Sequence, residues 1–183
     1  MTERMVRPAT PDDATAIAEA HVRGWQAAYR GLVPDAVLDG FDVARRASAW
    51  RERLTGDASD PTATRWTWVV ERAGDVVGFC QAGAARDEGV APPPGAGEVF
   101  AIYLRPEHRG TGLGRALFMA ATAHLSAAGF DPLLVWVFEA NTATRRFYEA
   151  AGFVADGAVH AIDFDGVVVP EIRYRRGGGT SAT

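Results

Sequence analysis

The sequence predicts an α/β protein, of the mixed α+β kind, built on one β-sheet with antiparallel strands at both ends and a parallel pair in the middle. A run rich in Trp and Val precedes the turn residues Ala73-Gly74-Asp75, and a second apolar run follows them, a pattern typical of an antiparallel hairpin. Residues 98–151 then alternate between strand and helix patterns, which favours parallel strands joined by a crossover helix. Residues 153–175 carry a second hairpin pattern and close the sheet.

Length and composition favour a single domain. The chain has 183 residues, enough for one well-buried core, and no long linker or low-complexity run divides it. Residues 84–97 are crowded with Pro and Gly and predict a loop rather than a domain boundary. We expect one domain over residues 1–176. Residues 177–183 are three glycines followed by small side chains, which cannot offset the entropy of ordering, so this tail is expected to be disordered.

Charge and residue usage exclude several classes of function. The formal net charge is -4, so the chain lacks the clustered cations on which nucleic-acid binding relies. All 19 basic residues are Arg, and the absence of Lys excludes Schiff-base chemistry. No apolar run is long enough to span a membrane, no signal segment is recognised, and the four His and one Cys lack metal-ligand spacing. The single Cys80 lies in an apolar strand pattern, which favours a reducing, cytoplasmic location.

The first half of the chain predicts helices before the first hairpin. Thr10-Pro11-Asp12-Asp13 is typical of a helix start, and apolar residues then recur every three or four positions as far as Tyr29. Gly24 is expected to divide this segment into two shorter helices. A further helix is predicted over residues 42–54. The hairpin strands follow over residues 65–72 and 76–84.

The second half of the chain predicts two strand–helix units and the closing hairpin. Gly129 and Gly152 lie where helix ends favour a left-handed residue. The predicted elements are a strand over residues 98–104, a helix over 112–128, a strand over 133–138, a helix over 141–151, and strands over 153–163 and 167–175.

A glycine-rich loop over residues 109–115 separates the first of these strands from its helix. Glycines admit a close backbone approach, and the unpaired N–H groups of a helix start can hold phosphate oxygens. A Walker A loop is excluded because it requires Lys, and a Rossmann fingerprint is disfavoured because residues 105–109 separate the strand from the glycines. Glu139 lies farther from the glycines than the acidic residue of that fingerprint. A tight strand-to-helix turn without a ligand is the alternative interpretation.

Two blocks of the sequence resemble the GNAT superfamily of acetyltransferases. Arg109-x-x-Gly112-x-Gly114, which follows Ile102-Tyr103-Leu104, is similar to the Arg/Gln-x-x-Gly-x-Gly/Ala signature of that family. Residues 141–153 resemble its Asn-to-Tyr helix and the Gly-Phe that follows. The match covers about residues 98–153. It implies the GNAT fold, with about six to seven strands, about four helices and a parallel strand pair that splays around CoA.

The resemblance also implies a reaction and its partners. The chain would transfer an acetyl group from acetyl-CoA, its cosubstrate, to a primary amine of a small molecule or peptide by direct attack in a ternary complex. Nucleic acid, membranes and metal ions are not expected partners. Dimers are frequent in the superfamily, so a homodimer is compatible with the resemblance. The alternative is an acyl-CoA-binding sensor or regulatory module without turnover.

The cofactor-binding roles of the family map onto one strand, one loop and one helix start. The backbone of Ile102, Tyr103 and Leu104 would bind the pantetheine arm as an added strand. Asn141 would bind the pantetheine through its side-chain amide, with an N-cap of the next helix as its alternative role. The residues that would hold the pyrophosphate are Arg109, Gly110, Thr111, Gly112, Leu113, Gly114 and Arg115.

Two catalytic residues follow from the same resemblance. Tyr148 matches the tyrosine acid of the family, and a phenol can donate a proton to a thiolate of comparable basicity. Its alternative role is core packing beside Phe147, although Phe147 continues the apolar stripe better. Glu98 lies where one branch of the family carries a glutamate base, and its alternative is a solvated carboxylate at a strand start. The oxyanion is expected to meet a backbone N–H near Tyr103 or Leu104.

The acceptor site is expected to include Trp25 and Tyr29, because the family builds this site from the first helices, the loop before the central strand and the last hairpin. His160 and Glu171 either face the acceptor or are solvated hairpin residues. Acidic residues in and beside the loop over residues 86–97 favour a cationic small-molecule acceptor.

Overall fold

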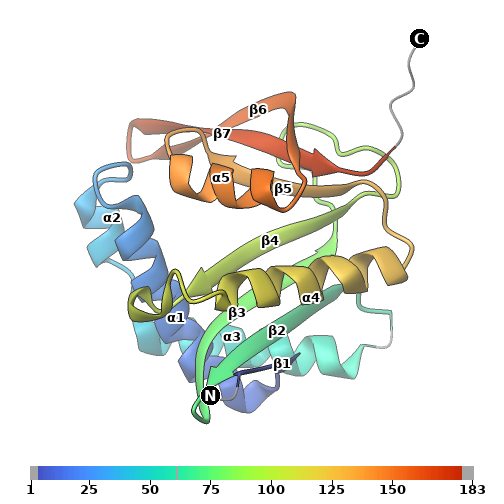
Figure 1. Ribbon diagram of the computed structural model, residues 1–183. Coiled ribbons are helices and arrows are strands. Elements are labelled where there is room, and N and C mark those ends of the chain that lie inside the picture. Colours follow the sequence, from blue (N-terminus) through green and yellow to red (C-terminus); the bar gives the residue numbers. More distant parts are fainter. Residues whose placement is uncertain (1–3, 61, 179–183) are drawn as a thin grey trace.

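The computed structural model describes residues 4–60 and 62–178. The strands are β1 (Arg4–Pro8), β2 (Arg65–Arg72), β3 (Asp75–Ala84), β4 (Gly97–Leu104), β5 (Leu133–Phe138), β6 (Val154–Phe164) and β7 (Val167–Arg176). The α-helices are α1 (Ala14–Tyr29), α2 (Asp35–Asp39), α3 (Val43–Ser59), α4 (Leu113–Ala127) and α5 (Thr142–Ala150). The strands form one sheet in the order β1-β2-β3-β4-β5-β7-β6. Among the strands that the structure describes, only the central β4–β5 pair is parallel, so the predicted mixed sheet is confirmed (Figure 1).

Helices cover both faces of this sheet (Figure 1). On one face, α1 and α3 enclose a core cluster that includes Ile17, Trp50 and Phe79. On the other face, α4 and α5 contribute to a second cluster that includes Leu117 and Phe118. Complete burial of each of these large side chains stabilises the fold by about 1.5–3 kcal/mol before entropy is counted.

Some predicted boundaries in the first half are wrong. α1 is continuous rather than divided at Gly24, where a Cβ would lie 3.0 Å from the Tyr103 side chain. Glycine at this position therefore allows α1 to approach β4 closely and does not mark a helix end. α3 runs to Ser59, beyond the predicted end at residue 54. β1 and α2 are absent from the sequence-based prediction, because elements of 5 residues are too short to show a periodicity.

The end of the chain is described only in part. Gly177 and Gly178 follow β7 without regular structure, and the rest of the predicted tail, residues 179–183, lies outside the described residues. Within the described ranges, no helix is both long and apolar enough to cross a membrane.

β4 and β5 pair with each other only at their beginnings. Residues 97–99 lie in register with residues 133–135, and beyond them the two strands separate. Gln81 and Ala82 are adjacent on β3, but they pair with Ala101 and Val99 on β4, so Phe100 is an extra, unpaired residue that forms a β-bulge. The bulge bends β4 at the point where β4 and β5 separate. α4 and α5 begin at the wide end of the resulting opening (Figure 1). The expected splayed pair is therefore present.

Candidate active site

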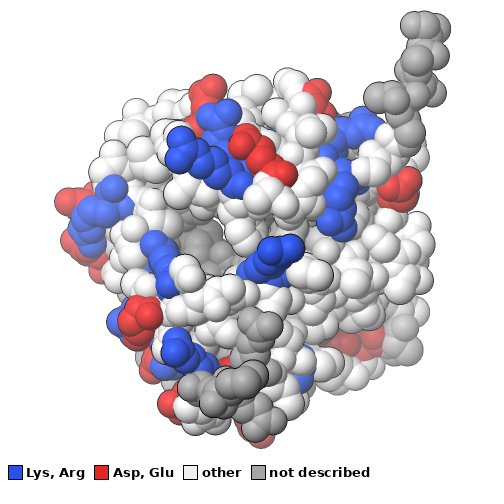
Figure 2. Space-filling view, in the orientation of Figure 1, with Lys and Arg blue, Asp and Glu red and all other residues white. Residues whose placement is uncertain are grey.

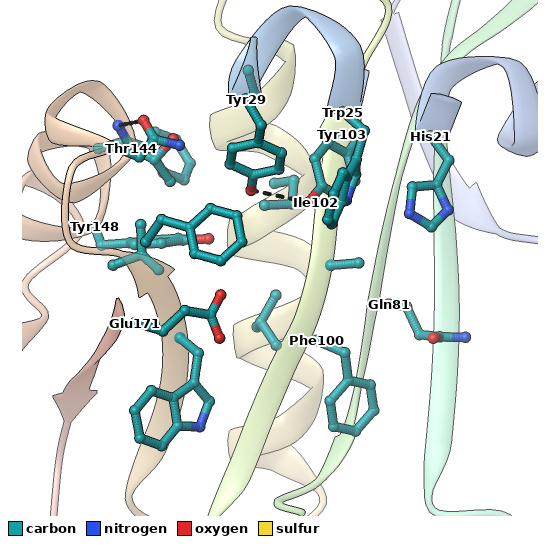
Figure 3. Close-up of a pocket in the computed structure, with 18 of the residues that line it drawn as sticks. His21, Trp25, Tyr29, Gln81, Phe100, Ile102, Tyr103, Thr144, Tyr148 and Glu171 are labelled. Carbon is teal, nitrogen blue, oxygen red and sulfur yellow. Dashed lines mark hydrogen bonds between the residues drawn. The ribbon is translucent and has the colours of Figure 1, made fainter. Parts of the chain in front are cut away.

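A cavity of about 1000 Å³ occupies the opening between β4 and β5. We call the part lined by Gly110, Gly114 and Asn141 the cofactor end, and the part lined by Glu98 and Glu171 the acidic end. Side chains from α1, β4, α5 and β7 converge on the space between them (Figure 3). Across the described ranges, no group of His, Cys, Asp and Glu side chains is arranged to hold a metal ion.

The free edge of β4 forms one wall of the cavity. The N–H of Arg105 donates to the carbonyl of Val77 on β3, at 2.9 Å. Hydrogen bonds alternate along an antiparallel pair, so the N–H of Tyr103 also faces β3, and those of Ile102 and Leu104 face the opening. The open side of β4 can therefore accept an added strand-like ligand. Of the two expected oxyanion positions, only the Leu104 N–H points into the cavity.

The glycine-rich loop turns sharply into α4. Gly110 and Gly112 have φ angles of 71° and 82°, a region that strains any residue with a side chain. The N–H of Ala116 donates to the Gly112 carbonyl at 3.1 Å, so the N–H groups of residues 113–115 have no partner inside the helix. This loop presents backbone donors and the positive end of the helix dipole to the cavity, which suits a phosphate group.

The predicted phosphate-binding residues divide into two groups. Arg109, Gly110 and Gly114 line the cavity. The Leu113 side chain is buried in the core, so only its backbone is available, and the Thr111 hydroxyl donates to a carbonyl of the preceding turn at 2.7 Å. Leu113 and Thr111 thus shape the loop and do not line the cavity. Gly112 and Arg115 also lie outside the cavity lining.

Arginines surround the cofactor end. The guanidinium of Arg109 donates to the carbonyl of Gly24 at 2.9 Å, which ties the loop to α1. Arg115 near the start of α4 and Arg146 on α5 are both exposed. This face of the molecule is hollowed, and basic side chains border the hollow (Figure 2). Although the chain is acidic as a whole, the border of the hollow suits an anionic group.

Asn141 caps α5 and lines the cavity at the same time. Its Oδ1 accepts the N–H of Thr144 at 3.2 Å, so the N-cap role that the sequence suggested is confirmed. The capping bond uses only the oxygen, which leaves the two amide N–H donors available for a ligand. The cofactor-binding role of Asn141 stays a prediction.

Tyr148 lies on the inner face of α5. Its ring belongs to the core cluster and lies 5.4 Å from the ring of Phe118, and the residue also lines the cavity. The expectation that Phe147 continues the apolar stripe better is wrong, because Phe147 only packs against the cluster that contains Tyr148. Burial, together with nearby ionisable groups, raises the pKa of the Tyr148 phenol, so its proton is retained at neutral pH.

Trp25 and Tyr29 of α1 line the cavity, where the sequence predicted an acceptor site. The hydroxyl groups of Tyr29 and Tyr103 lie 3.1 Å apart and share a hydrogen bond (Figure 3). The Trp25 ring packs edge-on against Tyr29 at 4.7 Å and against Phe41 at 5.2 Å. These contacts hold the aromatic wall of the cavity rigidly in place.

His21 also lines the cavity, although the sequence indicates for it only a place on the apolar stripe of α1. Its ring stacks on Tyr103 at 5.2 Å, and its Nδ1 accepts the indole N–H of Trp50 at 3.4 Å. Burial and nearby arginines lower the pKa of His21 to about 3, so the ring is neutral at physiological pH. Helical spacing alone cannot distinguish a buried histidine from one that borders a cavity.

Glu98 is not a solvated carboxylate. Its side chain is 1% exposed and accepts two hydrogen bonds from Arg86, one from the guanidinium at 2.8 Å and one from the backbone N–H at 3.0 Å. Arg86 also pairs with Glu88 at 3.0 Å and lies 4.3 Å above the ring of Phe100. The charge of Glu98 is therefore largely balanced by Arg86, which begins the loop that the sequence places at the acceptor site, although the sequence does not predict this pairing.

His160 and Glu171 are not solvated hairpin residues either. They lie opposite each other on β6 and β7, with 2.8 Å between His160 Nε2 and Glu171 Oε2. Their side chains are 15% and 16% exposed, and both residues line the cavity. The Trp136 ring packs edge-on against His160 at 4.4 Å. The closing hairpin thus contributes a histidine–carboxylate pair to the acidic end.

Comparisons with known proteins agree with one another. Residues 25–153 match the family model described as "Acetyltransferase (GNAT) family". The chain is 31% identical to the uncharacterized N-acetyltransferase YuaI of Bacillus subtilis (strain 168), over 79% of this chain and 77% of that protein. It is 48% identical over 47% of its length to mycothiol acetyltransferase of Thermobispora bispora, and that match spans only 29% of the longer protein.

Solved structures resemble the whole fold. The PaiA N-acetyltransferase from Thermoplasma acidophilum in complex with coenzyme A has a TM-score of 0.72 at 16% identity, covering 95% of this chain and 99% of that one. YncA from Salmonella typhimurium, a putative acetyltransferase with its cofactor acetyl-CoA, has a TM-score of 0.69 at 22% identity, covering 98% and 96%. At sequence identities this low, the similarity shows that these proteins share the fold of this chain and nothing more.

Proposed function

The chain belongs to the GNAT acetyltransferase family, and we propose that it transfers the acetyl group of acetyl-CoA directly to a primary amine in a ternary complex. The observation that carries this proposal is the single cavity that joins a phosphate-binding loop to an acidic end across the opening between β4 and β5. In such a cavity a thioester and an amine can be held side by side, and that proximity lowers the barrier to reaction. The acceptor class is a small-molecule or peptide amine.

The cofactor end has the groups that CoA requires. We propose that the N–H groups along residues 110–115, with Arg109, hold the pyrophosphate, and that the open edge of β4 binds the pantetheine arm. Ile102 and Leu104 contribute their backbone to that edge. Tyr103 contributes its side chain instead, because its backbone faces β3. The free amide donors of Asn141 complete the set.

Direct attack is favoured over an acyl-enzyme intermediate. The described residues that line the cavity include no cysteine, serine or lysine, which are the usual nucleophiles for such an intermediate. Cys80 is a fully buried free thiol, and burial raises its pKa, so it is not a reactive thiolate. A reduced, buried thiol also fits the cytoplasmic location that we propose.

Tyr148 is the proposed general acid. When the C–S bond of the thioester breaks, the departing thiolate needs a proton, and the phenol of Tyr148 retains one because burial raises its pKa. The tetrahedral oxyanion would be stabilised by a backbone N–H on the open edge of β4, and the Leu104 N–H is the best candidate.

The acceptor amine must lose a proton before it attacks. An alkylamine with a pKa of ~10.4 is neutral in only about one molecule per thousand at pH 7, which costs ~4–5 kcal/mol unless a base assists. Glu98 stays the sequence-based candidate for that base. Its location at the acidic end supports a role for a carboxylate there.

Thiol release from acetyl-CoA tests this function. Wild-type protein is assayed with spermidine, phenethylamine, glucosamine and a peptide with a free N-terminus, and products are identified by mass spectrometry. We expect release that depends on the amine and yields an acetylated amine. Acetyl-CoA binding without release from any of these amines would instead favour an acyl-CoA sensor, and acetylation of the protein itself would contradict direct attack.

A further inference from the structure

Glu171 projects from β7 into the middle of the cavity. It lies between Phe138 of β5 and His160 of β6 in the sheet. Its carboxylate faces the same space as the hydroxyl groups of Tyr148 and Tyr29 (Figure 3). If the proposed function holds, this is the space in which the amine meets the thioester, so Glu171 is within reach of the attacking nitrogen.

The pairing of Glu171 with His160 leaves the carboxylate available. The two side chains lie 2.8 Å apart, yet His160 Nε2 makes no well-aligned hydrogen bond. Among the described residues, no other ion pair or side-chain hydrogen bond engages the Glu171 carboxylate. Trp136 packs against the imidazole at 4.4 Å and limits its movement. His160 therefore holds Glu171 in position without saturating its oxygens.

Glu98 differs from Glu171 in this respect. Both of its oxygens accept hydrogen bonds from Arg86, and the guanidinium of Arg86 adds a full positive charge at 2.8 Å. Both oxygens of Glu98 therefore already have hydrogen-bond donors from the protein, which leaves them less accessible to the N–H of a bound amine. The geometry therefore favours Glu171 over Glu98 as a base.

The surroundings of Glu171 strengthen its basicity. Burial raises the pKa of its carboxyl group, the contact with His160 lowers it, and the nearby carboxylates of Glu88 and Glu98 raise it, with a net increase. A carboxylate with a raised pKa is a stronger base near neutral pH. The ionisable groups that face Glu171 are His160 on β6, Glu88 in the loop before β4, Glu98 and Tyr103 on β4, Tyr29 on α1 and Tyr148 on α5.

We infer that Glu171 is the general base that takes the proton from the acceptor ammonium, and that His160 is the residue that positions it. Glu171 removes one N–H proton, and the neutral nitrogen attacks the thioester carbon, so an N–C bond forms. The C–S bond then breaks, and the sulfur takes the proton of Tyr148. A second proton leaves the nitrogen and returns to Tyr148 through water, and the proton on Glu171 passes to solvent. The products are an acetamide, the CoA thiol and one released proton.

The pH dependence of kcat/KM, measured with spermidine and phenethylamine, tests this inference. Glu171→Gln is expected to lower kcat/KM by about 100-fold or more. It should also abolish the acid limb of the profile, which is the fall in kcat/KM at low pH that protonation of the base causes. Glu98→Gln is expected to lower the rate less and to keep that limb. His160→Gln should shift the limb with a loss of about tenfold. Asp165→Asn, at the turn of the same hairpin with a φ of 52° that Asn tolerates, is the matched control and should behave as wild type.

Acetyl-CoA affinity, measured by calorimetry on each variant, checks that the fold is retained, and Glu171→Asp provides a second variant that keeps a carboxylate and hence a pH-dependent rate. An acid limb that survives in Glu171→Gln and disappears in Glu98→Gln overturns the inference and leaves the proposed function standing. Wild-type protein that releases no thiol with any amine overturns the proposed function, and the inference with it.

Discussion

The two ends of the cavity are built in different ways. The cofactor end consists mainly of backbone groups from one loop, one helix start and the free edge of β4. The acidic end consists of side chains that separate elements bring together, with Glu98 paired to Arg86 and Glu171 paired to His160. A backbone site depends on local conformation, whereas a side-chain site depends on its partners. Substitutions at the cofactor end should therefore change binding alone, and those at the acidic end should change stability as well.

The largest effect is expected for Gly114→Asp at the cofactor end. A Cβ there would meet only Leu104, at 3.5 Å, and an acidic residue suits the first turn of a helix, so the fold should remain stable. A carboxylate beside the pyrophosphate site should lower acetyl-CoA affinity by about 1000-fold, ~4 kcal/mol, in a calorimetric titration. Gly56→Asp, in open space on α3, is the matched control. Wild-type affinity in Gly114→Asp would mean that the pyrophosphate lies elsewhere.

Tyr148→Phe should separate chemistry from binding. The substitution keeps the ring that packs on Phe118 and removes the proton donor, so kcat should fall by about 100-fold while acetyl-CoA affinity stays within about twofold. Steady-state kinetics and calorimetry on the same preparation measure both quantities. Tyr174→Phe, a buried tyrosine outside the cavity lining, is the control. A kcat close to that of wild type would exclude Tyr148 as the acid.

Arg86→Gln should expose the dependence of the acidic end on its partners. The substitution leaves Glu98 buried without a guanidinium, and because Arg86 is half exposed, we expect the free energy of unfolding to fall by about 1–2 kcal/mol. Urea denaturation measures this loss. Arg51→Gln on the exposed face of α3 should have no effect. Equal stability of the two variants would show that the Arg86 contacts do not stabilise the acidic end.

The smallest effect is a pH-dependent one. Burial raises the pKa of the Glu171 carboxyl in the folded protein. The contribution of Glu171 to stability is therefore fully present below the pKa that this carboxyl has in the unfolded chain, and it is lost as pH rises through the pKa that it has in the folded protein. Gln does not ionise, so the Glu171→Gln variant does not lose this stability as pH rises. The free energy of unfolding of the variant, relative to that of wild type, should therefore increase from acid to neutral pH. Urea denaturation at both pH values checks the sign. A relative stability that falls with rising pH would contradict the assigned shift.

The same contrast explains how much the sequence could predict. β2 and β5 begin and end where predicted, because turn residues and glycines mark the ends of their apolar runs. The glycine-rich loop could be located because its residues are contiguous and their chemistry lies in the backbone. The burial of Glu98 could not be predicted, because it depends on Arg86 across a loop, and the contact of His160 with Glu171 depends on the register of the last hairpin.

Gly24 and Tyr148 show a second limit of the sequence. A glycine inside a helical pattern is compatible with a helix end and with a close approach, and only the position of Tyr103 distinguishes them. Likewise, the spacing along α5 cannot decide whether Phe147 or Tyr148 is the more buried, because that depends on how α5 packs beside Phe118. Both errors arise from contacts between elements rather than within them.

Calorimetric titration of the wild-type protein with acetyl-CoA tests the central claim most directly, since it needs no knowledge of the acceptor. We predict saturable binding of one molecule per chain, competition by CoA, and no competition by ATP at comparable concentration. Absence of binding, or equal competition by ATP, would contradict the assignment of the cavity as an acetyl-CoA site.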